Sequence, residues 1–226
     1  MSPLWAAAVD GPLSISVGGG SSAVKLFLLL TALSFATAAL IAITSFTRIV
    51  IVLSFLRQAL GTPQLPPNQV VIALSLALTA FVMAPTFSRV SADAVSPYLD
   101  DRITGEEAFE RGSAPVLQFL LKQTRPDDLR LFYEISARPR PTRADEVPLT
   151  IAVPAFMVSE LTTAFRMGLF IFIPLLIIDL MVSAVLMALG MMMVPPTLVS
   201  LPLKIGVFLL ADGWHLLVQS LVRSFA

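Results

Sequence analysis

The 226-residue chain contains no cysteine and a single histidine, His215. The lack of cysteine excludes disulfides and thiolate-bound metal ions, and one histidine is too few for a histidine-rich metal site. The GxSxG and HExxH motifs of hydrolases and zinc proteases are also absent. The sequence therefore predicts no metal ion, no cofactor and no enzymatic activity.

Charged residues are scarce as well. They make up 13% of the chain, against about 25% in a typical soluble domain, and the formal net charge is zero. A neutral chain has no general attraction for nucleic acid, so none is expected as a partner. In contrast, 56% of the residues are hydrophobic and the mean hydropathy is +0.85, which indicates a membrane protein that contacts lipid.

The apolar residues form four long runs, and a helix of about 20 residues spans a hydrocarbon core of about 30 Å. Proline at position 85 is expected to close the second run, and Pro154 is expected to kink a helical stretch at 148–167. We expect an all-α fold with two membrane-associated helical hairpins, 23–85 and 148–226. The four runs lie at 23–43, 68–85, 168–190 and 198–222.

Two segments differ from these runs. Residues 1–22 are rich in proline, glycine and serine, which predicts a flexible N-terminal segment without a complete signal peptide. Residues 86–147 hold nine of the fifteen basic and eleven of the fifteen acidic residues, which predicts a charged, mostly helical domain. Arg48 and Arg57 in the connection at 44–67 favour a cytoplasmic position for it, which would leave the charged domain in the periplasm.

The ionisable residues within or beside the apolar helices include six of interest: Arg48, Glu160, Arg166, Asp179, Lys204 and Asp212. Such side chains cost about 2.5–3.5 kcal/mol each on membrane-insertion scales, so they are expected to pair or to face water. One interpretation is a proton or ion relay with Asp179 as the carrier. Because the signs alternate and nearly cancel, the sequence favours charge pairing between helices or subunits, with Asp179 or Glu160 opposite Lys204 or Arg48.

Three consecutive methionines, Met191, Met192 and Met193, follow Gly190 and precede Pro195 and Pro196. On one helix they would point about 100° apart, so a loop between these helix-breaking residues suits them better. Methionine is unbranched and polarizable and adapts to irregular surfaces. Two interpretations remain: core filler in a buried turn, which composition alone favours, or a deformable apolar collar contributed by several subunits.

Four long stretches resemble the FliP family of flagellar export-gate proteins, and the resemblance extends from about residue 10 to the end of the chain. These stretches are SFTRIVIVLSFLRQALGTPQLPPNQV (45–70), PAFMVSELTTAF (154–165), FIFIPLLIIDLMVSAVLMALGMMMVPP (170–196) and LPLKIGVFLLADGWHLLVQSLVRSF (201–225).

The resemblance implies a core pore subunit of the flagellar type III export gate, in the inner membrane at the flagellar basal body and largely at its periplasmic side. It implies a pseudo-helical oligomer, a pentamer of this chain with FliQ and FliR, completed by FlhB and FlhA, through which unfolded flagellar proteins pass. The methionine loop at 190–196 would line the narrowest part of the pore, with Met191, Met192 and Met193 as its gasket and Gly190, Pro195 and Pro196 as its hinges.

Two alternative functions remain open. The first is a homologous subunit of a virulence type III secretion injectisome, which shares the same family. The second is an ion-coupled membrane transporter, which would predict inverted repeats with matching broken helices. The two hairpins share proline breaks but little sequence similarity, and this disfavours transport of ions or small solutes.

Overall fold

The computed structural model describes residues 20–62, 64–139, 141, 143–191 and 193–225. These residues are mostly helical and contain no β-strand, which confirms the predicted all-α class. In chain order the elements are α1 (Gly20–Ala42), α2 (Phe46–Leu60), α3 (Asn68–Val90), the π-helix η1 (Ser91–Val95), α4 (Ser96–Leu99), α5 (Gly105–Gln123), α6 (Pro126–Ser136), the 3-10 helix η2 (Ala144–Glu146), α7 (Leu149–Ala188), α8 (Pro196–Leu210) and α9 (Gly213–Arg223).

The chain divides into two units, residues 1–40 and 41–226. In the first unit, α1 begins at Gly20, three residues before the predicted start at residue 23. Inside α1 the hydroxyls of Thr31, Ser34 and Thr37 donate to backbone carbonyls four residues earlier, so these polar groups are satisfied within the helix. The predicted flexible segment lies outside the described residues, apart from the part that α1 includes.

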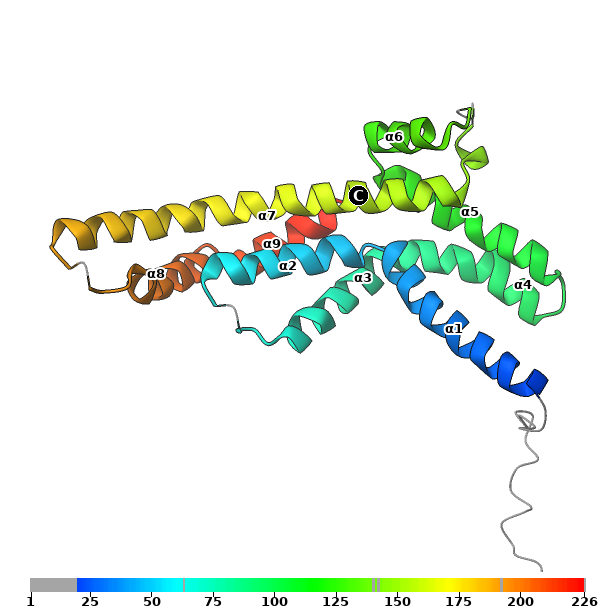
Figure 1. Ribbon diagram of the computed structural model, residues 1–226, viewed down its shortest axis with the longest axis horizontal. Coiled ribbons are helices and arrows are strands. Elements are labelled where there is room, and N and C mark those ends of the chain that lie inside the picture. The colour runs from blue at the N-terminus through cyan, green and yellow to red at the C-terminus, as the bar shows by residue number, and fades with distance from the viewer. Residues whose placement is uncertain (1–19, 63, 140, 142, 192, 226) are drawn as a thin grey trace, which may run out of the picture. The chain divides into compact units, whose positions relative to one another are not determined.

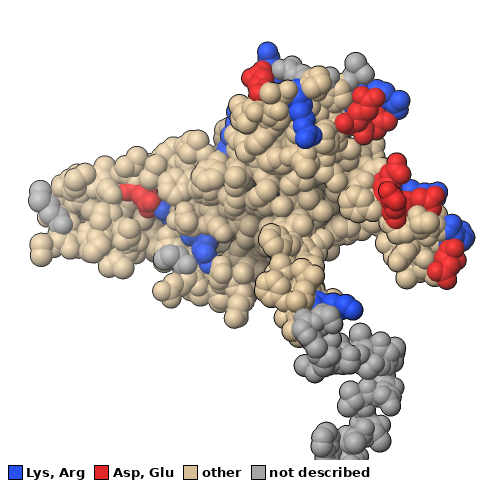
Figure 2. Space-filling view, turned by 45° about the vertical axis from the view of Figure 1, so that its right-hand side comes forward, with Lys and Arg blue, Asp and Glu red and all other residues tan. Residues whose placement is uncertain are grey.

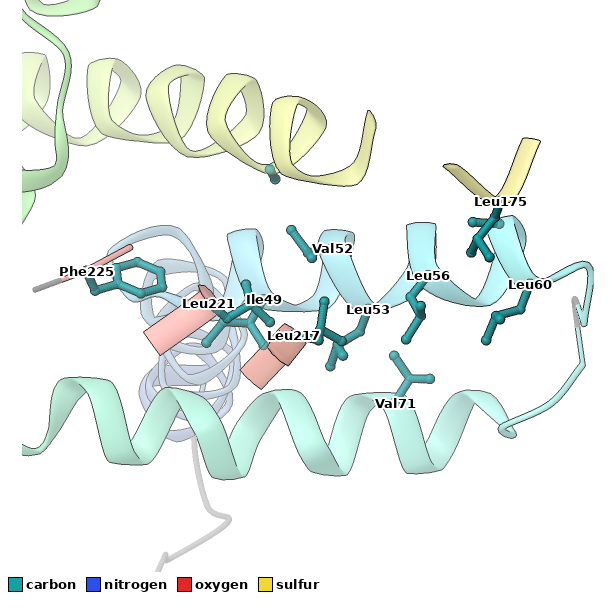
Figure 3. Close-up of a cluster of buried hydrophobic side chains, with 12 residues drawn as sticks. Ile49, Val52, Leu53, Leu56, Leu60, Val71, Leu175, Leu217, Leu221 and Phe225 are labelled. Atoms are coloured by element: carbon teal, nitrogen blue, oxygen red, sulfur yellow. The ribbon is translucent and has the colours of Figure 1, made fainter. Parts of the chain in front are cut away.

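In the second unit, α7 runs beside α2, and α8 and α9 return alongside it (Figure 1). The apolar residues of α2 recur every three or four positions, which places one face of that helix in the core. Figure 3 shows Leu53, Leu56 and Val71 between α2 and α3. The full set of buried residues is Ile49, Val52, Leu53, Leu56, Ala59, Leu60, Val71, Ala164, Leu175, Leu217, Leu221 and Phe225.

A second cluster joins α5 and α6 to the first turns of α7. Leu120, Ile151 and Phe156 are its centre, and none of them is more than 4% exposed. Thr104 starts α5 with a reciprocal capping box to Glu107, and Pro126 starts α6 with two aspartates in its first turn. The charged segment therefore folds on the beginning of α7. Figure 2 shows most acidic and basic side chains gathered in this part of the unit.

Two expectations about proline were wrong or incomplete. Pro85 does not close its helix, because α3 continues to Val90 and passes directly into η1. Met83 and Thr86 on either side of Pro85 are buried, and this packing offsets the lost hydrogen bond. In α7, Pro154 and Pro174 both lie inside one 40-residue helix and neither ends it.

The last apolar run is broken once. Pro202 and Lys204 do not interrupt it, because α8 runs through both. The break lies at Ala211 and Asp212, where α8 and α9 are bent by 64°. Asp212 takes the left-handed conformation with a φ of 51°, which a non-glycine residue seldom adopts.

Among the described residues, three helical stretches are long and apolar enough to cross a membrane: Ala23–Ala42, Asn68–Leu99 and Leu149–Ala188. Counting the bent pair α8 and α9 as one span makes four. These four coincide with the four predicted runs, although three of the stretches are longer or more broken than predicted.

α7 and α2 come very close at Gly168. A Cβ atom added there would lie 2.6 Å from Cγ of Phe55, well inside van der Waals contact. Phe55 also meets Phe165 edge-on, with ring centroids 5.2 Å apart. The glycine at position 168 therefore lets α2 and α7 pack closely against each other.

Candidate functional site

The connection between α7 and α8 carries the methionine run. Two hydrogen bonds end α7, from the Met191 amide to the Leu186 carbonyl at 2.9 Å and from the Gly190 amide to the Met187 carbonyl at 3.0 Å. This pattern is a Schellman motif, which needs a left-handed residue, and Gly190 supplies it with a φ of 74°. The helix therefore stops just before the methionines.

Proline starts the next helix. Pro196 is the first residue of α8 and Pro195 precedes it, so the missing proline amide falls where no intrahelical bond is needed. Between these two boundaries, Met193 is 95% exposed and Met191 is 43% exposed. Met192 lies outside the described residues. The connection thus presents methionine outward, and it is not a buried turn within this chain.

The surroundings of this loop are also apolar and exposed. Large apolar side chains at the end of α7 and the start of α8 are half exposed or more: Val185, Met187, Leu189 and Leu198. No charged residue lies between Asp179 and Lys204. The connection between α7 and α8, which we call the methionine tip, therefore offers no charged ligand to an ion. Its side chains can adapt their shape, since methionine has three freely rotating side-chain bonds.

Asp179 and Lys204 hold the two helices that carry the loop. The ammonium of Lys204 lies 2.6 Å from Oδ2 of Asp179 and donates to the Ala59 carbonyl at 2.9 Å. The Ser200 hydroxyl donates to the other carboxylate oxygen at 2.6 Å. Lys204 is buried, whereas the Asp179 side chain is 30% exposed. This cluster ties α7, α8 and the end of α2 together about three helical turns below the loop.

Arg48 and Glu160 form a second, fully buried pair. Nε and Nη2 of Arg48 donate to the two carboxylate oxygens of Glu160, a bidentate arrangement that favours arginine over lysine. The guanidinium also donates to the backbone and hydroxyl oxygens of Ser224 at 2.9 Å and to Gln123 at 3.3 Å. It stacks over the Phe225 ring at 3.9 Å.

Four of the six charged residues named from the sequence thus form two separate ion pairs, and each pair joins two helices of the same chain. Their other partners could not be read from the charge pattern. Ser200 lies one helical turn before Lys204, a spacing that could have indicated a shared face. The contacts of Arg48 with Gln123 and Ser224 join residues far apart in sequence, and no local signal points to them.

A third polar cluster was not predicted. The Ser159 hydroxyl donates to Oδ2 of Asp128 at 2.6 Å and accepts the Arg125 amide at 3.0 Å. Arg125 in turn pairs with the same aspartate at 3.0 Å. This cluster fastens the start of α6 to α7 next to Glu160. Within the described parts of the chain, no group of three histidine, cysteine or acidic side chains could hold a metal ion.

Comparisons with known proteins extend over nearly the whole chain. A sequence model described as the FliP family matches residues 29–221. The chain is 53% identical to the flagellar biosynthetic protein FliP of Bacillus subtilis, over 91% of this chain and 93% of that protein. It is 54% identical to the FliP of Pectobacterium carotovorum, over 92% and 81% of the two chains, and 48% identical to that of Aquifex aeolicus, over 95% and 91%.

Proposed function

The chain belongs to the FliP family, and we propose that it is a component of the flagellar protein export gate in which the loop after α7 seals the protein-conducting pore. The family and a role in flagellar biosynthesis, both predicted from the motifs, are confirmed by the relatives. The names of these relatives, flagellar biosynthetic proteins, favour the flagellar function over the injectisome alternative.

The exposed methionine tip is the observation that carries the proposal. A seal for a pore that conducts unfolded chains must exclude ions at rest and yet widen around side chains of different size. Apolar side chains exclude ions because they cannot replace the ions' hydration shells. Unbranched thioether side chains adapt to irregular shapes. Met191 and Met193 meet both demands, and Met192 is included by its place in the sequence.

The hinges and the ion pair would position this seal. Gly190 and Pro195–Pro196 set where the helices end, so the loop has few residues and a defined start and finish. The Asp179–Lys204 pair keeps α7 and α8 in register below it. Arg48 and Glu160 act farther from the loop, as the anchor of the bundle.

The assembly that this function requires extends beyond one chain. One tip cannot close a ring, so the proposal includes a homo-oligomer, a pentamer by the family resemblance, with FliQ, FliR, FlhB and FlhA. The large apolar side chains exposed along α7 and α8 fit such burial against neighbours or lipid. We place the assembly in the inner membrane at the flagellar basal body, largely on the periplasmic side, with residues 86–147 as the periplasmic domain and unfolded flagellar proteins as cargo.

Replacing Met191, Met192 and Met193 together by alanine tests the seal. Alanine removes the deformable bulk but leaves the loop length unchanged, so we expect cells to leak ions and small solutes while export and motility largely persist. Membrane conductance and swimming are the measurements. A matched control replaces Leu121, Leu129 and Leu131 of the α5–α6 region by alanine, which should leave conductance unchanged. Unchanged conductance in the methionine variant would refute the seal.

An ion-coupled transporter remains the second candidate because the α8–α9 span is broken at an aspartate, as in some transporters. Asp179→Asn separates the two. In a gate, Asp179 is a latch with Lys204, so the variant should keep a low resting conductance and retain export. Loss of proton coupling in Asp179→Asn, together with normal conductance in the methionine variant, would favour transport instead.

A further inference from the structure

Two of the six ionisable residues named from the sequence have no partner among the described residues. Arg166 on α7 and Asp212 between α8 and α9 make no ion pair and no side-chain hydrogen bond among the described residues. Both are exposed. The other four of these six residues are paired, so Arg166 and Asp212, of opposite sign, are the two of the six left without a partner.

Arg166 lies on an exposed apolar face of α7. Leu169, Phe170 and Ile173 follow it at helical spacing and are 56%, 78% and 45% exposed. Ala164 and Gly168, which point in other directions, are buried against α2. A guanidinium on such a face, in a membrane-length helix, is costly unless it pairs with an anion or faces water.

Asp212 is held at the break and its carboxylate is free. It stands at the N-cap position of α9 but its side chain makes no capping hydrogen bond, which an aspartate there usually does. The break is closely packed: Phe208 meets Trp214 edge-on at 5.6 Å, and a Cβ on Gly213 would lie 2.3 Å from the Phe208 ring. The neighbouring Leu210 is 91% exposed. The carboxylate is therefore presented outward beside apolar surface.

The two residues lie within the same crosslinked part of the helical bundle. Lys204 on α8 is level with Asp179 on α7, and Ser224 after α9 is joined through Arg48 to Glu160. Asp212 lies between these two crosslinks in the chain, at the 64° bend between α8 and α9. Arg166 lies on α7 between the same two crosslinks, in the stretch from Glu160 to Asp179.

We propose that Arg166 of one copy of this chain pairs with Asp212 of the next copy. The inference rests on the proposed function, because it assumes that copies assemble around a pore. Two different patches meet in such a contact, which makes it heterologous, and heterologous contacts build rings or helical assemblies. The pair would neutralise both charges where the apolar faces meet and set the register between neighbours.

Chemical crosslinking tests the geometry, and the natural absence of cysteine makes every introduced thiol unique. The two Cα atoms of an arginine–aspartate pair are too far apart for a direct disulfide, so a bifunctional thiol reagent with a spacer of about 8 Å is used on native membranes. The double variant Arg166→Cys/Asp212→Cys should give a ladder of oligomers. A mixture of the two single variants should give dimers only.

The controls for this experiment use the same reagent. The pair Glu106→Cys/Asp212→Cys places one thiol in the first turn of α5 and should give no ladder. Absence of a ladder from the 166/212 pair overturns the inference, provided that lysine-directed crosslinking of the unmodified chain still traps homo-oligomers. If no homo-oligomer is trapped at all, the result contradicts the proposed function, which includes a homo-oligomer.

Charge reversal tests the energetics. Arg166→Asp and Asp212→Arg each place like charges together, and each should lower the yield of oligomer about tenfold, as a loss of about 1.4 kcal/mol does. The double reversal Arg166→Asp/Asp212→Arg should restore both oligomer yield and motility. If Arg166→Lys is tolerated but the double reversal fails to rescue, Arg166 instead binds an anionic lipid headgroup or an acid of another protein, and the inference is wrong.

Discussion

The two ends of α7 are packed very differently. Over its first three turns the helix is buried by α5, α6 and α2, and Ala152, Ala155, Phe156, Ser159 and Glu160 are each fully buried. From Ile173 onward only Leu175, Val182 and Leu186 are buried, and large apolar side chains alternate with them on the surface. One helix therefore has an end that is complete within this chain and an end that is not.

The difference shows how an assembly subunit can combine a stable anchor with a surface that awaits partners. At the first end the buried charged residues Arg48 and Glu160 find their partners within the chain. At the second end a single, partly exposed ion pair, Asp179–Lys204, joins α7 to α8, and the remaining surface of these two helices is apolar. We expect mutations at the first end to act on stability, and mutations at the second end to act on assembly and sealing.

The largest effect on stability is expected at Glu160. Glu160→Ala leaves the Arg48 guanidinium buried without its counterion, and breaking such a pair costs about 3–5 kcal/mol. Thermal unfolding in detergent should show this as a strong loss of helix stability. Asp100→Ala, which removes an exposed pair with Arg102, is the control and should change stability by less than about 1 kcal/mol. Equal effects of the two variants would contradict the anchoring role.

The close approach of α7 and α2 should be the next most sensitive point. Gly168→Ala drives a methyl group into the Phe55 ring, and overpacking of this kind costs about 1–3 kcal/mol. Gly206→Ala in α8 is a matched control, because a Cβ there has nothing within 4 Å and alanine favours helix. In thermal unfolding, Gly206→Ala should be at least as stable as the parent chain. Adding Phe55→Ala should recover part of the loss in Gly168→Ala.

At the second end of α7, Gly190→Ala should reduce stability by a smaller amount. An alanine in the left-handed conformation is strained by about 1–2 kcal/mol, so the Schellman hydrogen bonds of Gly190 and Met191 should weaken. Hydrogen exchange of the amides at 190–191 measures this directly. Gly190→Asn is the control, since asparagine tolerates that conformation. Identical exchange in the alanine variant and the parent chain would show that the motif does not hold the helix end.

The smallest effect concerns pH in the charged segment. The Thr104 backbone amide donates to the Glu107 carboxylate at 2.9 Å and holds the pKa of Glu107 below its ordinary value of 4.5. The Thr104 hydroxyl and Arg111 lower it further, against a raising contribution from burial. A lowered folded-state pKa adds stability that is complete above the unfolded pKa and is lost as pH falls through the folded pKa.

Acidification should therefore loosen the first turn of α5 without affecting α7. Hydrogen exchange at 105–108, corrected for intrinsic rates, should speed up as pH falls below 4.5. Glu107→Gln cannot titrate and should abolish this dependence. A pH dependence that persists in Glu107→Gln would place its origin elsewhere.

Much of the fold could be predicted because its cause is local. The four apolar runs coincide with the membrane-length helical stretches, and the α7–α8 boundary follows from Gly190 and Pro196, whose backbone preferences need no tertiary context. The prediction that Pro85 ends its helix was wrong because the helix there depends on tertiary contacts. Its neighbours Met83 and Thr86 are buried in tertiary contacts that the sequence does not display, and these keep the helix intact.

The methionine run, with which the functional hypothesis began, could be read from the sequence as a break between helices. Opposite charges in the apolar helices likewise predicted pairing, since an isolated charge there is too costly. Only the tertiary structure decided that Arg48 meets Glu160 and Lys204 meets Asp179, and that Met191 and Met193 are exposed. Local conformational preference acts over a few residues, whereas these pairings join residues 25 to 112 positions apart, and their geometry arises only when the helices pack.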